Sequence, residues 1–126
     1  GFGLKSGAIA ATVAHDSHNI CVLGTSDADM AAAVNALIKL QGGQVVVKSG
    51  KVTASVSFPV AGLLSAEPFD KLDICLKNIS KALHETGCTL PEPFQQLSFL
   101  ALPVIPHLKL TDKGLFDADA FEHISV

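Results

Sequence analysis

The stretch GAIAATVAHDSHNICVLG, which runs from Gly7 to Gly24, decides how the chain begins to fold. Two apolar runs, Gly7–Ala14 and Asn19–Gly24, are separated by consecutive polar residues. Short apolar runs bounded by turn residues are typical of β-strands, and loops of three to five residues are common in hairpins. The stretch therefore predicts a β-hairpin with an unusually polar connecting loop.

A helix and a second hairpin are predicted next. Ser26 is a good N-cap for a helix that ends at Gly42 and Gly43. The segment QVVVKSGKVTASVSFPV, residues 44–60, predicts two strands around a Ser-Gly turn. From Phe69 to Glu85, apolar residues recur every three or four positions, which predicts a second, amphipathic helix.

The C-terminal part has a looser pattern and most of the prolines. Residues 94–100 predict a short helix, and HLKLTDKGLFD, residues 107–117, predicts a further hairpin. Pro103 and Pro106 favour extended chain before that hairpin. We therefore expect an extended C-terminal tail after the second long helix.

The order ββαββα indicates an α+β fold. We expect a mixed or antiparallel sheet with two helices packed on one face. The 126 residues suit a single domain over residues 1–126, because a chain of this length can bury a substantial core. Hydrophobic residues make up 48% of the chain, which indicates either a well-filled core or a face that contacts another domain.

Composition argues against two classes of partner. All nine cationic residues are lysines, and Trp and Tyr are absent, so the chain lacks the side chains best suited to phosphate recognition and base stacking. We therefore expect no nucleic-acid binding. No apolar run reaches the roughly 18 residues of a membrane helix, so we expect no membrane insertion either.

The three cysteines, Cys21, Cys75 and Cys88, are far apart and form no C-x-x-C motif. Unpaired, apolar-flanked cysteines indicate a reducing, cytoplasmic setting. The chain opens with GFGLKSG, and its single methionine is Met30. We therefore expect it to be a piece of a longer polypeptide.

The polar loop His15-Asp16-Ser17-His18-Asn19 is the most informative candidate site. Three interpretations are open: an Asx-type turn in which Asp16 and Asn19 accept backbone N–H groups, a ligand-contact loop, and a metal site built on the two histidines. So dense a cluster of polar groups is costly to bury without partners, so the loop must face water or a polar neighbour. Phosphate-loop, dinucleotide and zinc cytidine-type deaminase motifs are absent.

Two long segments carry a resemblance to a known family. Residues 7–52, from GAIAATVAHDSHN to QVVVKSGKV, and residues 97–117, LSFLALPVIPHLKLTDKGLFD, resemble the C-terminal domain of the microbial adenine deaminases. The likeness covers nearly the whole chain in the same order. The resemblance implies a hydrolase of the amidohydrolase superfamily, active in purine salvage and adenine catabolism, that converts adenine to hypoxanthine and ammonia.

The family's catalytic metals are expected elsewhere. The resemblance implies two divalent ions, manganese or iron, held by a (β/α)-barrel that precedes this domain, and nothing in this chain matches that ligand set. We therefore expect no metal ligand in this fragment, and no activity from it alone.

The resemblance also suggests roles for the polar loop. Asp16, Ser17 and Asn19 are candidate substrate-binding residues, because their side chains can match the donors and acceptors of adenine. His15 and His18 are candidate catalytic residues, because imidazole exchanges protons near neutral pH. The alternatives are a purely structural or homo-oligomerisation domain of the same enzyme, and a relative that acts on another purine or cyclic amidine.

Overall fold

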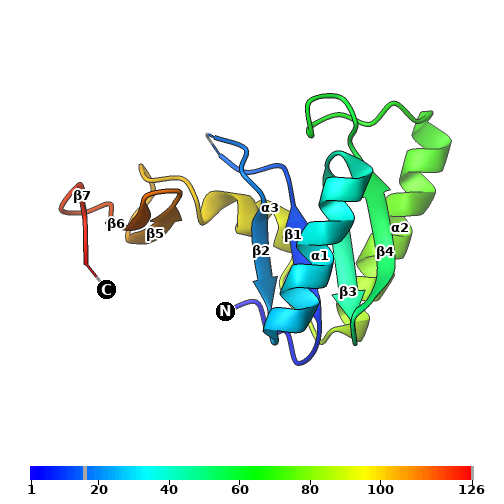
Figure 1. Cartoon of the computed structure of the whole chain (residues 1–126), viewed down its shortest axis with the longest axis horizontal. Coiled ribbons are helices and arrows are strands. Elements are labelled where there is room, and N and C mark those ends of the chain that lie inside the picture. The colour runs from blue at the N-terminus through cyan, green and yellow to red at the C-terminus, as the bar shows by residue number, and fades with distance from the viewer. Residues whose placement is uncertain (16, 126) are drawn as a thin grey trace.

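The structure is a computed structural model that describes residues 1–15 and 17–125. Its centre is a four-stranded antiparallel sheet, and a separate three-stranded sheet follows at the C-terminal end (Figure 1). The elements are β1 Ala8–Ala11, β2 Cys21–Gly24, α1 Asp27–Leu40, β3 Gly43–Lys48, β4 Lys51–Ser57, α2 Phe69–Glu85, α3 Pro93–Phe99, β5 Leu108–Thr111, β6 Gly114–Asp117 and β7 Glu122–His123.

The α+β class and the order ββαββα are confirmed, and both predicted hairpins of the main sheet form. The strand order is β2-β1-β3-β4, so the first hairpin pairs with the second through β1 and β3. The loop of the first hairpin is longer than expected, because the chain leaves the ladder at Thr12. The Thr12 hydroxyl donates to the Gly62 carbonyl (2.6 Å) and accepts from the Gly43 N–H (2.8 Å).

The expectation that both long helices pack on one face is wrong. Helix α1 covers the face that carries Ala8, Ala10, Val45 and Val47, whereas α2 covers the opposite face, which carries Ile9 and other apolar residues. Every position of β1 is buried, so both of its faces need an apolar cover. A sheet with helices on one side only would have left one of these faces in water.

Helix α1 is tied to the sheet by its first turn. The Ser26 hydroxyl accepts from the Asp29 N–H (3.2 Å), which is the N-cap that the sequence predicts. The buried Asp29 carboxylate accepts in turn from the Gly50 N–H (2.6 Å) in the β3–β4 turn. One residue thus orients the helix against the second hairpin, while Ala33 and Leu37 fill the interface.

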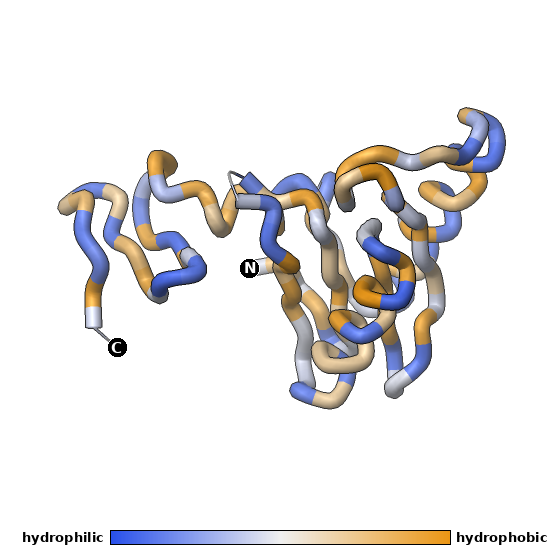
Figure 2. The backbone as a smooth tube through the Cα atoms, turned by 45° about the horizontal axis from the view of Figure 1, so that its top comes forward, coloured by the Kyte–Doolittle hydropathy of each residue, from blue (hydrophilic) through white to orange (hydrophobic). Residues whose placement is uncertain are grey.

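The C-terminal part is more structured than the expected extended tail. The predicted short helix forms as α3, and the predicted hairpin forms as β5 and β6, with β7 added as a third strand. Figure 1 shows this sheet projecting away from the main body, and Figure 2 shows apolar and polar segments alternating along it. The buried Lys109 ammonium donates to the carbonyls of Pro106 and Leu108 (both 3.1 Å).

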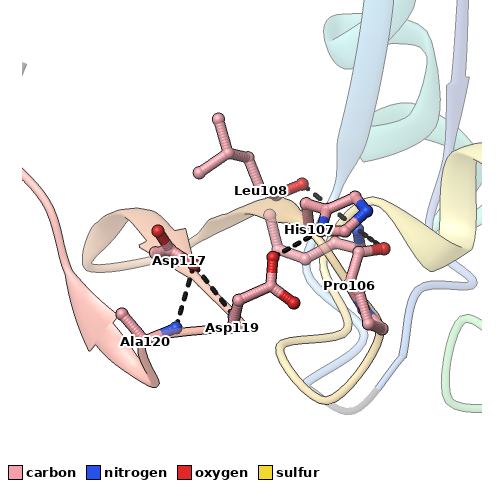
Figure 3. A network of polar contacts seen from close by, with 7 residues as sticks. Pro106, His107, Leu108, Asp117, Asp119 and Ala120 are labelled. Atoms are coloured by element: carbon pink, nitrogen blue, oxygen red, sulfur yellow. Dashed lines mark hydrogen bonds and ion pairs between the residues drawn. The ribbon is translucent and has the colours of Figure 1, made fainter.

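Polar contacts close the C-terminal sheet on itself (Figure 3). His107 Nδ1 contacts the Asp119 carboxylate, and the Asp117 carboxylate accepts from the N–H groups of Asp119 (2.9 Å) and Ala120 (3.1 Å). His123 packs edge-on against Phe116. His123 therefore packs within the small sheet, whereas the exposed His107 contacts Asp119 at its surface.

We expect Gly43→Ala to lower the free energy of unfolding by about 2–4 kcal/mol. Gly43 has a φ of +142°, and an added Cβ would lie 1.9 Å from the Val56 carbonyl oxygen. Gly50→Ala is the matched control, since Gly50 also has a positive φ but has no atom within 4 Å of an added Cβ. Denaturant titration of both variants measures the difference, and equal losses would contradict the packing argument.

Candidate functional site

The loop between β1 and β2 is anchored by its backbone and presents its side chains outward. The His15 N–H donates to the Ser98 carbonyl of α3 (3.3 Å), and the His18 N–H donates to the Ala14 carbonyl (3.1 Å). Ala14 is fully buried, whereas His15, Ser17, His18 and Asn19 are exposed. The fifth candidate, Asp16, lies outside the described residues. Two backbone N–H groups of the loop are therefore satisfied within the fold, and the side chains of His15, Ser17, His18 and Asn19 are open to water or a partner.

The two histidines differ in what holds their rings. The His15 ring stacks on Phe99 of α3, with ring centroids 5.0 Å apart and planes 11° apart. His18 Nδ1 accepts from the Ala14 N–H at 3.4 Å, so the neutral ring carries its proton on Nε2. Nε2 of His18 is therefore the nitrogen that could exchange a proton with a bound molecule.

Ser17 and Asn19 form a pair. Asn19 Nδ2 donates to Ser17 Oγ (3.1 Å), which leaves the Ser17 hydroxyl proton and Asn19 Oδ1 to be used elsewhere. In the part of the chain that the structure describes, no backbone N–H donates to the Asn19 side chain. For Asn19, the Asx-type turn is therefore not what the structure shows, and the loop closes instead through the backbone bond from His18.

The candidate residues do not all meet at one cavity. A groove of about 830 Å³ runs between α2 and α3, and His15 lies on its wall. A second cavity of about 400 Å³ lies on the other side of the loop, and Ser17 and Asn19 line it. His18 lines neither cavity. The loop therefore lies between the groove and the smaller cavity and contributes residues to both.

The smaller cavity includes residues that the sequence does not single out as site residues. Asp112, in the turn between β5 and β6, lines it together with Thr111 and Leu110, which lie at the end of β5. The Leu110 N–H donates to the Leu100 carbonyl just after α3 (2.9 Å), which brings this hairpin beside the loop. No motif spacing could have indicated this, because Asn19 and Asp112 lie on segments far apart in the sequence.

Burial changes the chemistry of one residue of this cavity. Cys21, at the start of β2, lines the smaller cavity, and desolvation by burial raises the pKa of its thiol. A raised pKa keeps the thiol protonated and unreactive at neutral pH, so Cys21 is not an activated nucleophile.

In residues 1–15 and 17–125, no three His, Cys, Asp or Glu side chains come together as a metal-binding group. The donor set of these residues therefore does not fit a divalent metal centre. None of the helices in the described part combines the length and the apolar character that crossing a membrane requires.

Comparison with known proteins covers nearly all of the chain. The family described as "Adenine deaminase C-terminal domain" matches residues 1–122. An adenine deaminase of Brucella anthropi is 60% identical over 124 residues, which make up 98% of this chain and 22% of that protein. Adenine deaminase 1 of Rhizobium meliloti is 59% identical over 121 residues, or 96% of this chain and 21% of that protein.

A third relative gives the same extent. An adenine deaminase of Brucella melitensis is 56% identical over 124 residues, or 98% of this chain and 21% of that protein. The chain therefore spans about a fifth of the length of these curated relatives. The resemblance seen in the hairpin loop and the C-terminal motif is confirmed: the chain belongs to the adenine deaminase C-terminal domain family.

Proposed function

We propose that the full-length protein carrying this domain is an adenine deaminase, which hydrolyses adenine to hypoxanthine and ammonia. The observation that carries the proposal is the match of residues 1–122 to the family, together with relatives named adenine deaminase at 56–60% identity. The matched region covers 98% of this chain, so it includes both the polar loop and the C-terminal hairpin that line the smaller cavity.

The role proposed for this domain is to bring the loop of residues 15–19 to the substrate. Four of its side chains are exposed although the backbone beneath them is anchored to α3 and Ala14. An anchored backbone with free polar side chains is suited to positioning a ligand, because little ordering entropy remains to be lost on binding. Asp16 shares the proposed role on its sequence position alone.

Within the loop, His18 is the better candidate for moving a proton. Its Nδ1 is held by the Ala14 N–H, so Nε2 presents a defined donor. The ring of His15 is packed on Phe99 and lies on the wall of the other cavity, which suits a positioning role. We therefore assign proton exchange to His18 and loop positioning to His15.

The proposal includes two divalent metal ions, manganese or iron, bound outside these residues. The described residues supply no ligand cluster for them, so any such site lies in the remaining length of the full protein. Such ions would activate water for attack on the ring carbon that bears the amine. A cytoplasmic location and a role in adenine salvage and catabolism complete the proposal, supported by the three free cysteines.

A second candidate function is assembly, and one observation favours it. Val104, Leu108 and Leu110 are each more than half exposed, and the two leucines lie on one face of β5. Exposed apolar side chains grouped in this way are typical of a surface that another chain or domain covers. On this view the C-terminal sheet mediates homo-oligomer formation, and the polar loop is only a solvated turn.

We expect His18→Ala in the full-length protein to lower kcat/KM for adenine by about 100-fold, because a proton-transfer group is lost. Asn19→Ala should lower it by about tenfold, because one hydrogen bond to substrate is lost. Asn78→Ala is the matched control, since Asn78 is exposed on α2 and lines neither cavity. Ammonia release measures activity, and thermal unfolding should be unchanged in all three variants.

Two outcomes would contradict these roles. If both loop variants stay within twofold of the Asn78→Ala control, the loop does not contact substrate. If the unmodified protein releases ammonia from another aminopurine or a cyclic amidine but not from adenine, the substrate is wrong although the reaction class holds.

For the assembly function, we expect the double variant Leu108→Ser, Leu110→Ser to change the sedimentation coefficient of the full-length protein. A shift from an oligomer to a monomer would support an oligomer interface on β5, because two exposed apolar contacts have become polar. If the variant remains an oligomer of the same size, β5 does not form the oligomer interface. The exposed control is Ile74→Ser on α2, which lies outside the C-terminal sheet.

A further inference from the structure

The two faces of the small C-terminal sheet are packed differently. On one face, the buried Phe116 ring packs edge-on against the rings of Phe121 and His123, with centroids 5.3 and 5.1 Å away. The other face carries the leucines of β5 and β6, which are Leu108, Leu110 and Leu115. Leu110 and Leu115 are directly opposed across the two strands, so their side chains point to the same side of the sheet. We call these three residues the leucine face.

The main body of the domain does not cover the leucine face. Leu108 and Leu110 are more than half exposed, and Leu115 is only partly buried. Over the described ranges 1–15 and 17–125, neither core cluster contains a residue that follows Leu97, and Phe116 is the one apolar side chain after Leu97 that is buried. A sheet of three short strands needs a packed apolar face to be stable. The leucine face therefore needs a cover from outside these residues.

The leucine face continues into the smaller cavity beside the polar loop. Leu110 lines this cavity together with Ile20 and Leu100, which are each more than one-third exposed. Contiguous exposed apolar side chains of this kind mark a surface that another protein segment covers. Ser17 and Asn19 of the polar loop line the same cavity. A segment that covers the leucine face therefore also meets the polar loop.

The position of the N-terminal end indicates which segment that is. The family is a C-terminal domain, and its relatives are about five times as long as the matched region, so the rest of the full-length protein joins at this end. The end is fixed on the main body, because the Lys5 N–H donates to the Thr86 carbonyl (2.8 Å) while Phe2 and Leu4 pack on the core beneath α2. Figures 1 and 2 show the N-terminus on the side of the main body that faces the C-terminal sheet.

We infer that the leucine face docks onto the part of the same polypeptide that precedes this domain. The inference goes beyond the proposed function, because it does not depend on the substrate. It competes with the assembly alternative, in which a second copy covers the two leucines of β5. The tether favours the same polypeptide, because a segment joined by a short linker has an effective concentration in the millimolar range, which a separate copy does not reach. Docking would also hold the polar loop against the preceding part of the protein.

Photo-cross-linking in the full-length protein identifies what covers the leucine face. The probe is p-benzoylphenylalanine in place of Leu110, and the control carries the same probe in place of Leu64. The two leucines are matched in exposure, at 65% and 64%, but Leu64 lies in the connector between β4 and α2. An equal mixture of unlabelled and heavy-nitrogen-labelled protein is irradiated, and mass spectrometry then distinguishes attachment within one chain from attachment between chains. We expect the probe at Leu110 to attach to peptides outside residues 1–126 of its own chain, about tenfold more often than the probe at Leu64.

A charge on the leucine face tests the docking independently. Leu110→Asp places a carboxylate where an apolar partner is inferred, and burial of an unpaired charge disfavours docking. We expect protease cleavage within residues 100–123 of the full-length protein to become about tenfold faster, because the undocked sheet opens more often. Leu64→Asp is the matched control, and its cleavage rate should stay within about twofold of the unmodified protein because its charge remains in water.

Three results would overturn the inference. Attachment mainly between unlabelled and labelled chains means that a second copy covers the leucine face. Attachment from Leu110 that is no more frequent than from Leu64 means that no segment covers it, and equal cleavage of the two aspartate variants means that Leu110 stays in water. Neither measurement uses ammonia release, so a full-length protein that does not deaminate adenine would refute the proposed function and leave this inference standing.

Discussion

Strand β1 is covered on both faces, and the rest of the structure depends on this double burial. Ile9 points into the core beneath α2, while Ala8 and Ala10 lie under α1. Because β1 pairs with β2 on one edge and β3 on the other, its backbone is saturated with hydrogen bonds as well. The end of β1 is therefore a rigid point, and the polar loop begins there with Thr12 bonded to two neighbouring segments.

Helix α3 connects the main sheet to the candidate site through hydrogen bonds and ring packing. Its Ser98 carbonyl accepts from the His15 N–H, its Phe99 ring supports the His15 ring, and the Leu100 carbonyl that follows it accepts from the Leu110 N–H. One short helix thus positions the loop on one side and the C-terminal hairpin on the other. The smaller cavity lies between these two segments, and Leu97 of α3 and Leu100 just after it are among its lining residues.

Chemistry and recognition fall on different parts of the protein in this picture. The described residues bring together polar groups that could orient a base, yet no three potential metal ligands converge among them. Family membership is shown over residues 1–122, and the relatives are about five times as long as the matched region. The proposed division assigns substrate recognition to this domain and water activation to the rest of the protein. It would account for the exposed side chains of His15, Ser17, His18 and Asn19.

Much of the fold could be predicted from local patterns. The hairpins, the Ser26 N-cap, the two long helices and the 107–117 hairpin all follow from periodicity and turn residues, which act over a few positions. The family was also recognisable, because the two motifs lie in contiguous sequence. The polar loop could be identified as a candidate site for the same reason.

What the sequence by itself determined is therefore the elements from β1 to β6, their order, the family and the exposed loop. Only the tertiary structure decided that α1 and α2 cover opposite faces, that the tail forms a sheet, and that Asp112 lies at the cavity of Ser17 and Asn19. The physical reason is the sequence separation over which each kind of interaction acts. Periodicity reports which residues avoid water, but it does not report which distant surface covers them, and that choice is made by packing between segments far apart in the chain.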